Sequence, residues 1–367
     1  MSNRHRQEQQ SIGKSARNRI HVITGLQVQH LIAKLDILRP LFPSLPLLEL
    51  VSETDYIPGE VSGGGGKHVL QECSILGNLR RIGAFDVPDA EHVHLTAIEL
   101  GAGTGRLSER LQRVTKQEMT HVMIDRQEFT PSQCRDGRMR NRAKNSDSIR
   151  RIVGDIANFD VGDDCHEIEA SERSRCFCMS KHLCGPACDL AIAALERVPV
   201  EWRPPFAFAT CCHYLCTFDE FAGKKYWIEL GLTEEDFEVA VAVSQWYSLK
   251  TSRDVNICKS DNIANDSASS VDHGFTSSFL DYRELISNAS SALKVQMSPK
   301  AQTSAMIPSD EFERTFSNED KARLGQNVKI LLDMLRVAEL QQLGYKAEMV
   351  LYTSKSIENR LLVGGIN

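Results

Sequence analysis

Two short segments of this sequence place lysine, histidine and cysteine close together, and these residue types could carry out chemistry. The first reads S-K-H-L-C-G over residues 180–185, and the second reads C-C-H over residues 211–213. Lysine and histidine can hold or move a proton, and cysteine thiolates bind soft metal ions. Each segment follows an apolar run that reads as a strand, so we expect both at the ligand-binding edge of a sheet.

Three interpretations of this Cys/His set are open. It could line a substrate pocket in which Lys181 and His182 supply the polar groups, it could bind zinc, or its cysteines could pack as small buried apolar side chains. The C-x₃-C spacing permits zinc, but the commoner C-x₂-C is absent. We favour the substrate pocket, without a metal. The set comprises His182, Cys184, Cys188, Cys211, Cys212, His213 and Cys216.

A glycine-rich turn between a strand and a helix is the next chemical signal. Residues 96–107 read T-A-I-E-L-G-A-G-T-G-R-L, with an apolar run leading into Gly101, Gly103 and Gly105. Such a turn directs backbone N–H groups toward a ligand. Its spacing differs from the dinucleotide pattern G-x-G-x-x-G, and the acidic Glu99 disfavours a phosphate. Together these features favour S-adenosylmethionine, whose methionine half carries an ammonium group. The alternative is a tight turn in another kind of α/β protein.

Acidic residues at the ends of the next two predicted strands would complete a cofactor site. Asp125 ends the apolar strand 121–124. At this position a Rossmann-like sheet holds a cofactor ribose through its hydroxyl groups. Asp155 follows the strand at 152–153. Together with Ile156 it is expected to flank the adenine, whose amino group can donate to the carboxylate.

Alternating apolar patterns predict strands and helices in turn, and hence a parallel sheet with right-handed crossovers. The predicted strands are 96–100, 121–124, 152–153, 176–179 and 206–210, followed by an antiparallel pair at 345–352 and 360–363. The predicted helices are 25–38, 69–81, one that opens at 106, 189–197 and 321–343.

Composition argues against several classes of protein. The net charge of −6 is not that of a protein that coats nucleic acid, so any RNA contact must come from a local patch. The 11 cysteines lack the spacing of a disulfide framework. That fits a reducing compartment, and we expect the cytoplasm, the nucleus or both. We find neither the apolar core of a secretory signal nor an uncharged stretch long enough to span a bilayer, and we expect no membrane association.

The two Cys/His segments, taken with their neighbours, resemble a known family. K-H-L-C-G-x-A-x-D-L at 181–190, followed by C-C-H-x-x-C at 211–216, is similar to the eukaryotic tRNA 2′-O-methyltransferases that modify nucleoside 4 of the acceptor stem. The resemblance covers residues 68–367 apart from 250–318. Its further matches are Q-E-C-S-I-L-G-N-L (71–79), the glycine turn, Asp125-Arg126, Asp155-Ile156, S-Q-W (244–246), K-I-L-L-D (329–333) and S-I-E-N (356–359).

The resemblance implies a fold, a cofactor and a partner. The fold is α/β: a Rossmann-like class I S-adenosylmethionine-dependent methyltransferase with a seven-stranded mixed sheet. The cofactor is S-adenosyl-L-methionine, the partner is tRNA, and no protein partner is expected. Two alternatives are open. One is a class I methyltransferase of the related methyltransferase-like group with a different RNA or small-molecule acceptor, and the other is a non-catalytic tRNA-binding protein.

We divide the chain into three parts. Residues 1–20 are expected to form a disordered basic arm, residues 21–92 a helical N-terminal extension, and residues 93–367 the methyltransferase domain. Within that domain residues 250–318 are rich in Ser, Asn, Asp and Thr. We expect them to be a low-complexity insertion with little structure.

Site residues follow from the position of each motif. Lys181 and His182 are the catalytic candidates because they end the fourth predicted strand, and His213 is the reserve candidate. The acceptor pocket is expected to be lined by cysteines: Cys184, Cys211, Cys212 and Cys216. The expected cofactor-binding residues are Glu99, Gly101, Gly103, Gly105, Asp125, Arg126, Asp155 and Ile156.

The RNA-binding surface must be sought among basic residues. Members of the family begin with small Cys/His zinc-binding modules, whereas the first cysteine here is Cys73. Either that N-terminal part is missing from this form, or RNA binding relies on other surfaces. A basic stretch after the second predicted strand is the expected substitute, since it carries enough positive charge to meet several phosphates. The alternative is a solvated loop. The basic residues are Arg135, Arg138, Arg140, Arg142 and Lys144, with Arg150 and Arg151 beyond them.

Overall fold

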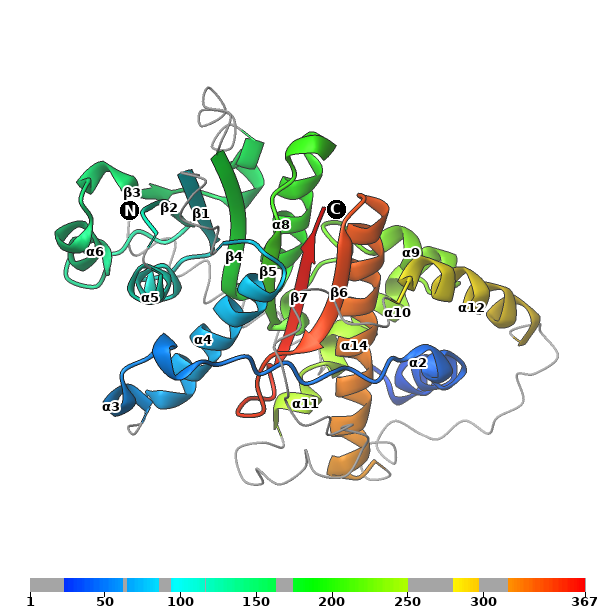
Figure 1. The fold of residues 1–367 in the computed structure, drawn as a ribbon. Helices are drawn as coiled ribbons and strands as arrows, with labels where there is room; N and C mark the ends of the chain where they lie inside the picture. Colours follow the sequence, from blue (N-terminus) through cyan, green and yellow to red (C-terminus); the bar gives the residue numbers. More distant parts are fainter. Residues whose placement is uncertain are drawn as a thin grey trace.

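A seven-stranded mixed sheet forms the centre of the computed structural model, with strand order β3-β2-β1-β4-β5-β7-β6 (Figure 1). The strands are β1 (His94–Leu100), β2 (Met119–Asp125), β3 (Ile149–Val153), β4 (Ser174–Cys184), β5 (Phe206–Cys211), β6 (Lys346–Leu351) and β7 (Arg360–Gly365). The first five strands are parallel, and β7 runs antiparallel to both of its neighbours. The structure describes residues 23–61, 65–85, 94–115, 117–162, 174–249, 280–296 and 316–366. The predicted α/β class and the seven-stranded mixed sheet are confirmed.

Helices cover both faces of the sheet. They are α2 (Gly25–Leu38), α3 (Pro58–Val61), α4 (Gly66–Arg81), α5 (Arg106–Val114), α6 (Asp136–Arg142), α8 (Pro186–Glu196), α9 (Lys224–Glu229), α10 (Glu234–Val243), α11 (Trp246–Leu249), α12 (Tyr282–Gln296) and α14 (Asn318–Gln342). Short 3₁₀ helices lie at Arg39–Leu41, Glu53–Asp55, Ser146–Ser148, Ile156–Asn158, Val200–Trp202 and His213–Leu215. Among the described residues, we find no helix with the length and apolar character needed to cross a membrane.

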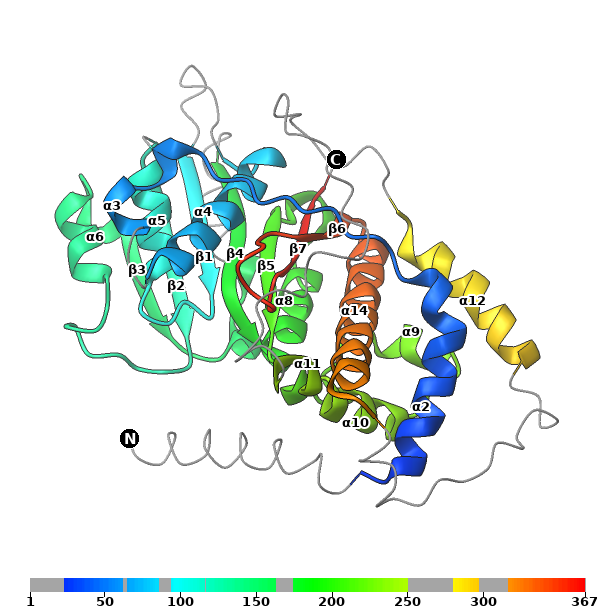
Figure 2. The same cartoon turned by 90° about the horizontal axis from the view of Figure 1, so that it is seen from below.

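The alternating side chains of the strands build two large apolar cores on the two faces of the sheet, and a third, smaller cluster lies beside α6. On β5, Phe206 and Phe208 join the core beneath α2, α8, α10 and α14, whereas Ala207 and Ala209 join the core beneath α4 and α5. Successive residues of a strand point to opposite faces, so a central strand must be apolar on both sides. The helices of the two layers flank the sheet in Figure 2.

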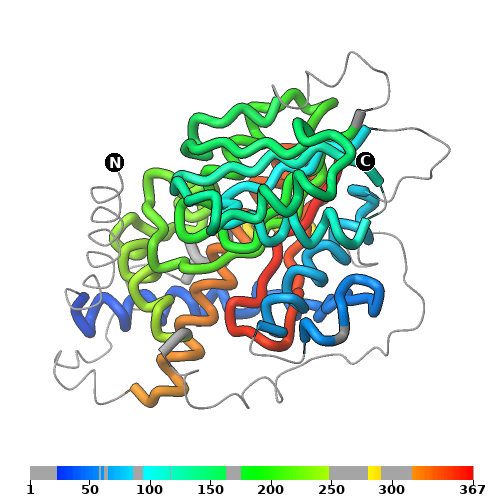
Figure 3. The backbone as a smooth tube through the Cα atoms, turned by 90° about the vertical axis from the view of Figure 1, so that its left-hand side faces the viewer, coloured from blue at the N-terminus to red at the C-terminus, as the bar shows by residue number. Residues whose placement is uncertain are grey.

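The segment at residues 23–61 connects the side of the molecule where α2 packs to the side where α3 and α4 lie. Helix α2 begins at a capping box in which Thr24 and Gln27 exchange hydrogen bonds, and it packs against α10. An extended segment then runs past the sheet toward α3 and α4 (Figures 2 and 3) and forms a β-bridge between Leu47 and Leu351. Helix α4 therefore packs over the sheet, although it precedes every strand of the sheet in the sequence.

Part of the predicted insertion is helical, which corrects the expectation of little structure there. Helix α12 buries Tyr282, Ile286 and Ala289 in the main core, and α14 and α9 lie against it. These few apolar residues recur at helical spacing, and their partners come from distant segments, so the local sequence carries only a weak signal. The predictions for residues 1–20, and for 250–279 and 297–315, fall on residues outside those described.

Candidate active site

Three left-handed glycines form the turn between β1 and α5. Gly101, Gly103 and Gly105 have φ values of 68°, 53° and 81°. A Cβ atom at Gly105 would lie 2.9 Å from Met123 Sδ and 3.0 Å from Arg151 Nη2, which both belong to flexible side chains that could move aside. The left-handed backbone conformation is therefore what favours glycine here.

Glu99 fastens this turn to the helix that follows. Its Oε2 accepts hydrogen bonds from Ser108 N at 3.0 Å and from Ser108 Oγ at 2.6 Å. Burial raises the pKa of Glu99 to about 7, although these hydrogen bonds favour the ionised form. The carboxylate caps the first turn of α5 from inside the protein. Its position thus explains how the turn is held, a role that differs from the predicted contact with a methionine group.

Asp125 contacts the glycine turn directly. Its Oδ2 accepts a hydrogen bond from Gly103 N at 2.7 Å, and its Oδ1 accepts one from Gln127 N at 2.8 Å. A carboxylate oxygen can accept more than one hydrogen bond, so both oxygens keep capacity for a ligand. A Cβ at Gly103 would meet no atom within 4 Å, which shows open space beside this carboxylate.

The remaining predicted cofactor residues lie just after two neighbouring strands, Arg126 after β2 and Asp155 with Ile156 after β3. Arg126 Nε lies 3.3 Å from Asp155 Oδ2, and Asp155 Oδ1 accepts a hydrogen bond from Ala157 N. Ile156 is buried in the main core. The side chain of Ile156 therefore anchors the loop after β3 in the core, while the Arg126–Asp155 ion pair lies nearer to solvent.

Lys181 and His182 lie at an irregularity in β4. The pairing of β4 with β5 shifts register between Ser180 and Leu183. Bulges of this kind redirect side chains and are common beside active sites. Lys181 is only 8 % exposed, whereas His182 is exposed. The shift therefore leaves one polar side chain inside the protein and its neighbour outside.

Glu72 of α4 is the main partner of Lys181. Lys181 Nζ lies 2.9 Å from Glu72 Oε1 and donates to the carbonyl oxygen of His68 at 3.2 Å. Burial lowers the pKa of the Lys181 ammonium, and the charge of Glu72 opposes that shift. Arg106, directly after Gly105, places its Nε 3.1 Å from the same Glu72 oxygen. One buried carboxylate therefore connects α4, β4 and the glycine turn.

The sequence analysis did not single out Glu72 as a site residue, although it lies within the Q-E-C motif. A signal was present, because Glu72 is an acidic residue beside apolar positions of a predicted helix. Fully buried acids of this type need a cationic partner. Which cation it pairs with depends on the tertiary fold.

The Lys181 segment touches the glycine turn. A Cβ at Gly101 would lie 3.5 Å from Leu183 Cδ2 and 3.6 Å from the carbonyl oxygen of His182. Ser180 Oγ lies 4.0 Å from the same point and is buried without a hydrogen-bond partner. A buried hydroxyl without a partner is uncommon and calls for an explanation. Together with the open space at Gly103, it is consistent with a polar ligand at this turn, and the residues present fit a cofactor.

His213 belongs to a buried polar network. Its Nε2 lies 2.8 Å from Asp333 Oδ1, and the ring is fully buried. Asp333 also accepts hydrogen bonds from Thr210, Arg336 and Arg360. Burial lowers the pKa of the His213 imidazole. A side chain enclosed in this way holds β5, α14 and β7 together, so we do not carry His213 forward as a catalytic residue.

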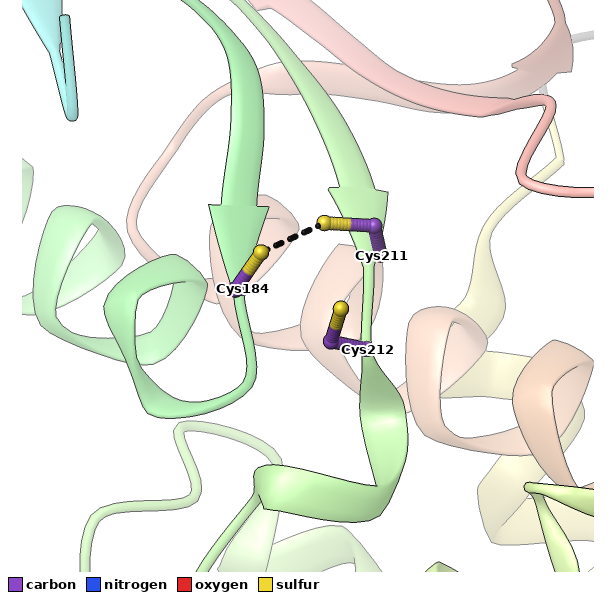
Figure 4. A group of neighbouring side chains, drawn as sticks. All are labelled: Cys184, Cys211 and Cys212. Atoms are coloured by element: carbon purple, nitrogen blue, oxygen red, sulfur yellow. Dashed lines mark hydrogen bonds between the residues drawn. The ribbon is translucent and has the colours of Figure 1, made fainter. Parts of the chain in front are cut away.

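The predicted cysteine set divides into two groups. Cys188 and Cys216 are buried in the main core, and Cys216 Sγ accepts a hydrogen bond from Arg336 Nη2 at 3.0 Å. Cys184, Cys211 and Cys212 lie together at the ends of β4 and β5, with all three sulfur atoms within 4.8 Å of one another (Figure 4). Cys216 therefore belongs to the packing of the core, apart from this three-cysteine cluster.

The predicted basic residues lie on and around α6, next to the glycine turn. Arg138, Arg140, Arg142 and Lys144 are exposed. Some of their charge is neutralised, since Arg142 pairs with Glu109 at 2.5 Å and Lys144 with Glu118 at 2.8 Å. Arg151 instead pairs with Asp136 and donates to the carbonyl oxygen of Gly103, so it braces the turn.

A polar cavity of about 300 Å³ opens between α4, α5 and α6. Among its lining side chains are Arg106, Arg110, Arg113, Arg135 and Arg138, and the glutamates Glu60, Glu72 and Glu109. Glu72, the partner of Lys181, therefore forms part of its wall. The cavity thus extends from Arg138 of α6 to Glu72, while Lys181 itself lies outside its lining.

Comparison with known proteins identifies the family. A family model described as "Methyltransferase TRM13" matches residues 70–364. This chain belongs to the TRM13 methyltransferase family. The match runs from within α4 to within β7, so it leaves out α2, α3 and the two 3₁₀ helices between them. It confirms the resemblance found in the sequence.

Several curated proteins are similar to this TRM13 family member. The human protein named tRNA:m(4)X modification enzyme TRM13 homolog is 26% identical over 346 residues, which cover 81% of this chain and 64% of the relative. The Schizosaccharomyces pombe enzyme of that name is 23% identical, covering 81% and 67%. A Dictyostelium discoideum homolog is 27% identical over 192 residues, covering 50% and 34%. This chain thus spans from about a third to two thirds of these relatives' lengths.

Proposed function

We propose that this chain transfers a methyl group from S-adenosyl-L-methionine to the ribose 2′-hydroxyl of nucleoside 4 in the acceptor stem of tRNA. The observation that carries the proposal is the contact between the glycine turn and the Lys181–His182 segment. A Cβ atom built on Gly101 would lie 3.6 Å from the carbonyl oxygen of His182. The family match supports the methyltransferase class, and the names of the relatives support tRNA and nucleoside 4.

The topology supports a Rossmann-like class I methyltransferase fold. The strand order has a reversal between β1 and β4, and the last strand of the chain is inserted antiparallel between β5 and β6. In open α/β sheets the ligand lies outside the carboxyl ends of the strands at such a reversal. The glycine turn after β1 and the Lys181 segment at the end of β4 flank this point.

The cofactor site follows from the residues around the turn. The Asp125 carboxylate would accept hydrogen bonds from the cofactor ribose, and Asp155 would face the adenine amino group. The open space at Gly103 would admit the methionine half, and Glu99 would keep the turn in place from below. When bound, the cofactor supplies an electrophilic methyl group attached to a positively charged sulfur.

The transfer forms a bond between the ribose oxygen and the methyl carbon and breaks the sulfur–carbon bond, whose electron pair stays on sulfur. The hydroxyl proton must leave as the oxygen–carbon bond forms. Lys181 supplies a positive charge that stabilises the oxygen as it loses its proton. His182 would be the proton acceptor, because it follows Lys181 in the chain and its exposed side chain can be reached from solvent. Desolvation and the Lys181 cation both lower the pKa of its imidazole. Such a base contributes roughly 10²–10⁴-fold to the rate.

The basic face of α6 is the proposed tRNA contact. Its exposed side chains, Arg138, Arg140 and Arg142, belong to a helix adjacent to α5 and to β3. Phosphate contacts of this kind set the position of a nucleic acid and carry no base specificity. The acceptor stem would lie along α6 with its fourth ribose turned toward Lys181.

Methyl transfer to defined tRNA tests the proposal. The purified full chain is incubated with methyl-labelled cofactor and a synthetic tRNA, and the same tRNA carrying a single 2′-deoxy substitution at nucleoside 4 serves as the control. We expect label in the first tRNA and none in the second. Equal labelling of both would refute the site of methylation, and no labelling of tRNA by a protein that binds the cofactor would refute the acceptor class. Label that appears only in a metabolite extract would favour the small-molecule alternative.

A further inference from the structure

The three-cysteine cluster of Cys184, Cys211 and Cys212 has the arrangement of a metal site. Cys184 ends β4 and Cys211 ends β5, and the two are direct partners in the register of the sheet. Their sulfur atoms lie 3.0 Å apart, and the sulfur of Cys212 lies within 4.8 Å of both. Figure 4 shows the three side chains pointing toward one another at the strand ends.

An unusual backbone conformation brings the third sulfur to the other two. Adjacent residues of a strand point to opposite faces, so Cys211 and Cys212 would diverge if β5 continued. Cys212 instead has φ 50° and ψ 42°, and among the described residues it is the one non-glycine residue with positive φ. A left-handed conformation costs a residue with a side chain roughly 1–2 kcal/mol. Such strain persists where the surrounding structure enforces it, often at functional sites.

The end of the neighbouring strand, β4, is also held in a defined conformation. Gly185 follows Cys184 with φ 57°, and its N–H donates to the carbonyl oxygen of Cys211 at 3.2 Å. A Cβ on Gly185 would lie 2.4 Å from Leu215 Cβ, so glycine is required. The two strand ends that carry the sulfurs are therefore locked against each other before any ion binds.

We propose that Cys184, Cys211 and Cys212 together bind one zinc ion. Zinc prefers thiolate ligands at about 2.3 Å, and tetrahedral geometry then places the sulfurs about 3.7 Å apart. The sulfur separations in the cluster, from 3.0 Å to at most 4.8 Å, bracket that value. Small changes in side-chain torsion angles would close the site. This replaces the prediction of a metal-free acceptor pocket for these three residues.

The electrostatic surroundings suit three thiolates and a divalent ion. Hydrogen bonds from Cys184 and Cys211 lower the pKa of Cys212 to about 3, and the pKa values of the other two thiols are raised in return. Zinc with three thiolates carries a net charge of −1, and the buried Lys329 ammonium supplies positive charge nearby.

The position of the site gives it an outward-facing side. Cys184 and Cys212 are half-buried, whereas Cys211 is buried. An ion held by three protein ligands keeps one position for water or an incoming group. The ion would join the ends of β4 and β5 next to the His182 segment, and would keep that wall of the proposed acceptor site rigid.

Metal content of the purified protein tests the proposal. The full chain is purified with a phosphine reductant and without chelators, and its zinc content is measured by mass spectrometry. We expect one zinc per chain, and a loss of that zinc in Cys184→Ser and in Cys212→Ser. The matched control is Cys134→Ser, a half-buried cysteine outside the cluster, which should keep the ion. Circular dichroism of each variant checks that it is folded.

Cobalt provides an independent readout on the wild-type chain. After zinc is removed with a chelator, added Co²⁺ should produce an intense thiolate-to-cobalt charge-transfer band, which each single serine variant weakens. Protein that holds only trace zinc, and that shows no such band with excess Co²⁺, would overturn the proposal. A Cys184–Cys211 disulfide found by peptide mapping of protein alkylated at lysis would overturn it as well.

Discussion

The ammonium group of Lys181 lies 2.9 Å from the carboxylate of Glu72, which belongs to a helix that precedes the sheet in the chain. Both side chains are buried, so removal of the Glu72 charge would leave the Lys181 ammonium without its carboxylate partner. The pair holds the Lys181 ammonium beside the glycine turn, since Glu72 also pairs with Arg106.

Removal of Lys181 should abolish most of the chemistry. We expect Lys181→Ala to lower the single-turnover rate of tRNA methylation by roughly 10²–10⁴-fold, because the positive charge beside the ribose oxygen is lost. The matched control is Lys34→Ala, another lysine largely shielded from solvent, which pairs with Asp236 at 2.6 Å. Rates within a few-fold of wild type for Lys181→Ala and for His182→Ala would place the acceptor site elsewhere.

The charge of Glu72 should appear in the pH profile. Glu72 opposes the lowering of the Lys181 pKa by burial, so Glu72→Gln should lower that pKa further. At alkaline pH the methylation rate of the variant should therefore begin to fall at a lower pH than that of wild type, because the Lys181 ammonium loses its proton at a lower pH. The measurement is the single-turnover rate against pH for wild type and variant. A profile that keeps its shape while its height drops would indicate a structural role only.

Asp125 should control cofactor affinity. We expect Asp125→Ala to weaken S-adenosylmethionine binding by about tenfold or more, which corresponds to about 1.4 kcal/mol. Titration calorimetry measures the affinity, and Glu128→Ala, an exposed acid on the same loop, is the control. Because Asp125 also accepts a hydrogen bond from Gly103 N, a loss of about 1 kcal/mol in stability is expected too. Wild-type affinity in Asp125→Ala would remove the ribose assignment.

Charge reversal on α6 should weaken tRNA binding. The triple variant Arg138→Glu, Arg140→Glu and Arg142→Glu is expected to bind tRNA less tightly and with a shallower dependence on salt, by about one unit of slope per lost phosphate contact. Lys224→Glu on α9, at the opposite end of the sheet in Figure 1, is the control. Unchanged affinity and slope in the triple variant would show α6 to be a solvated face.

Glu99 should make stability fall as pH rises. Burial raises its pKa from 4.5 to about 7, so between these values the folded protein keeps a proton that the unfolded chain has released. Stability from this group is full below about pH 4.5 and is lost as pH rises through 7, by on the order of 3 kcal/mol. Denaturant unfolding of wild type and Glu99→Gln tests this, since the variant should gain on wild type as pH increases from 5 to 8. A constant difference would contradict the shifted pKa.

The Asp333 network should dominate the stability of the C-terminal half. Asp333→Asn leaves Arg360 without its carboxylate partner in the core and removes one of the two carboxylates that pair with Arg336, whose ion pair with Asp189 remains. We expect a loss of about 3–5 kcal/mol in the free energy of unfolding. The melting temperature should fall by on the order of 10 °C. Asp219→Asn, at a carboxylate that is 92% exposed, should change it little. A melting temperature within about 2 °C of wild type would mean that the network relaxes around the amide.

Local patterns were sufficient to predict the sheet. The strands around Ile98, Val122 and Phe208 are buried on both faces and read as continuous apolar runs, and the left-handed glycines mark the turn between strand and helix. Helix α12 was not predicted because its buried apolar residues, Tyr282, Ile286 and Ala289, lie in a core shared with α14, α9 and α2, which are distant in sequence.

Prediction of the site was less complete for a related reason. The sequence indicated that Lys181 and Cys184 end one strand and Cys211 the next, so their convergence at one edge follows from topology. It did not indicate which side of β5 His213 would occupy. The left-handed turn at Cys212 decides this, directing the third sulfur outward and His213 inward to Asp333. Glu72 was missed because its partner lies on another element.

The insertion of β7 between β5 and β6 has a consequence for synthesis of the chain. Residues 206–211 emerge from the ribosome long before residues 360–365, so one edge of β5 has unpaired backbone groups in the interval. At that stage the nascent chain exposes an apolar strand edge with which strands of other chains could pair. Molecular chaperones that shield Phe206 and Phe208 until translation reaches residue 365 would be expected to raise the yield of active protein.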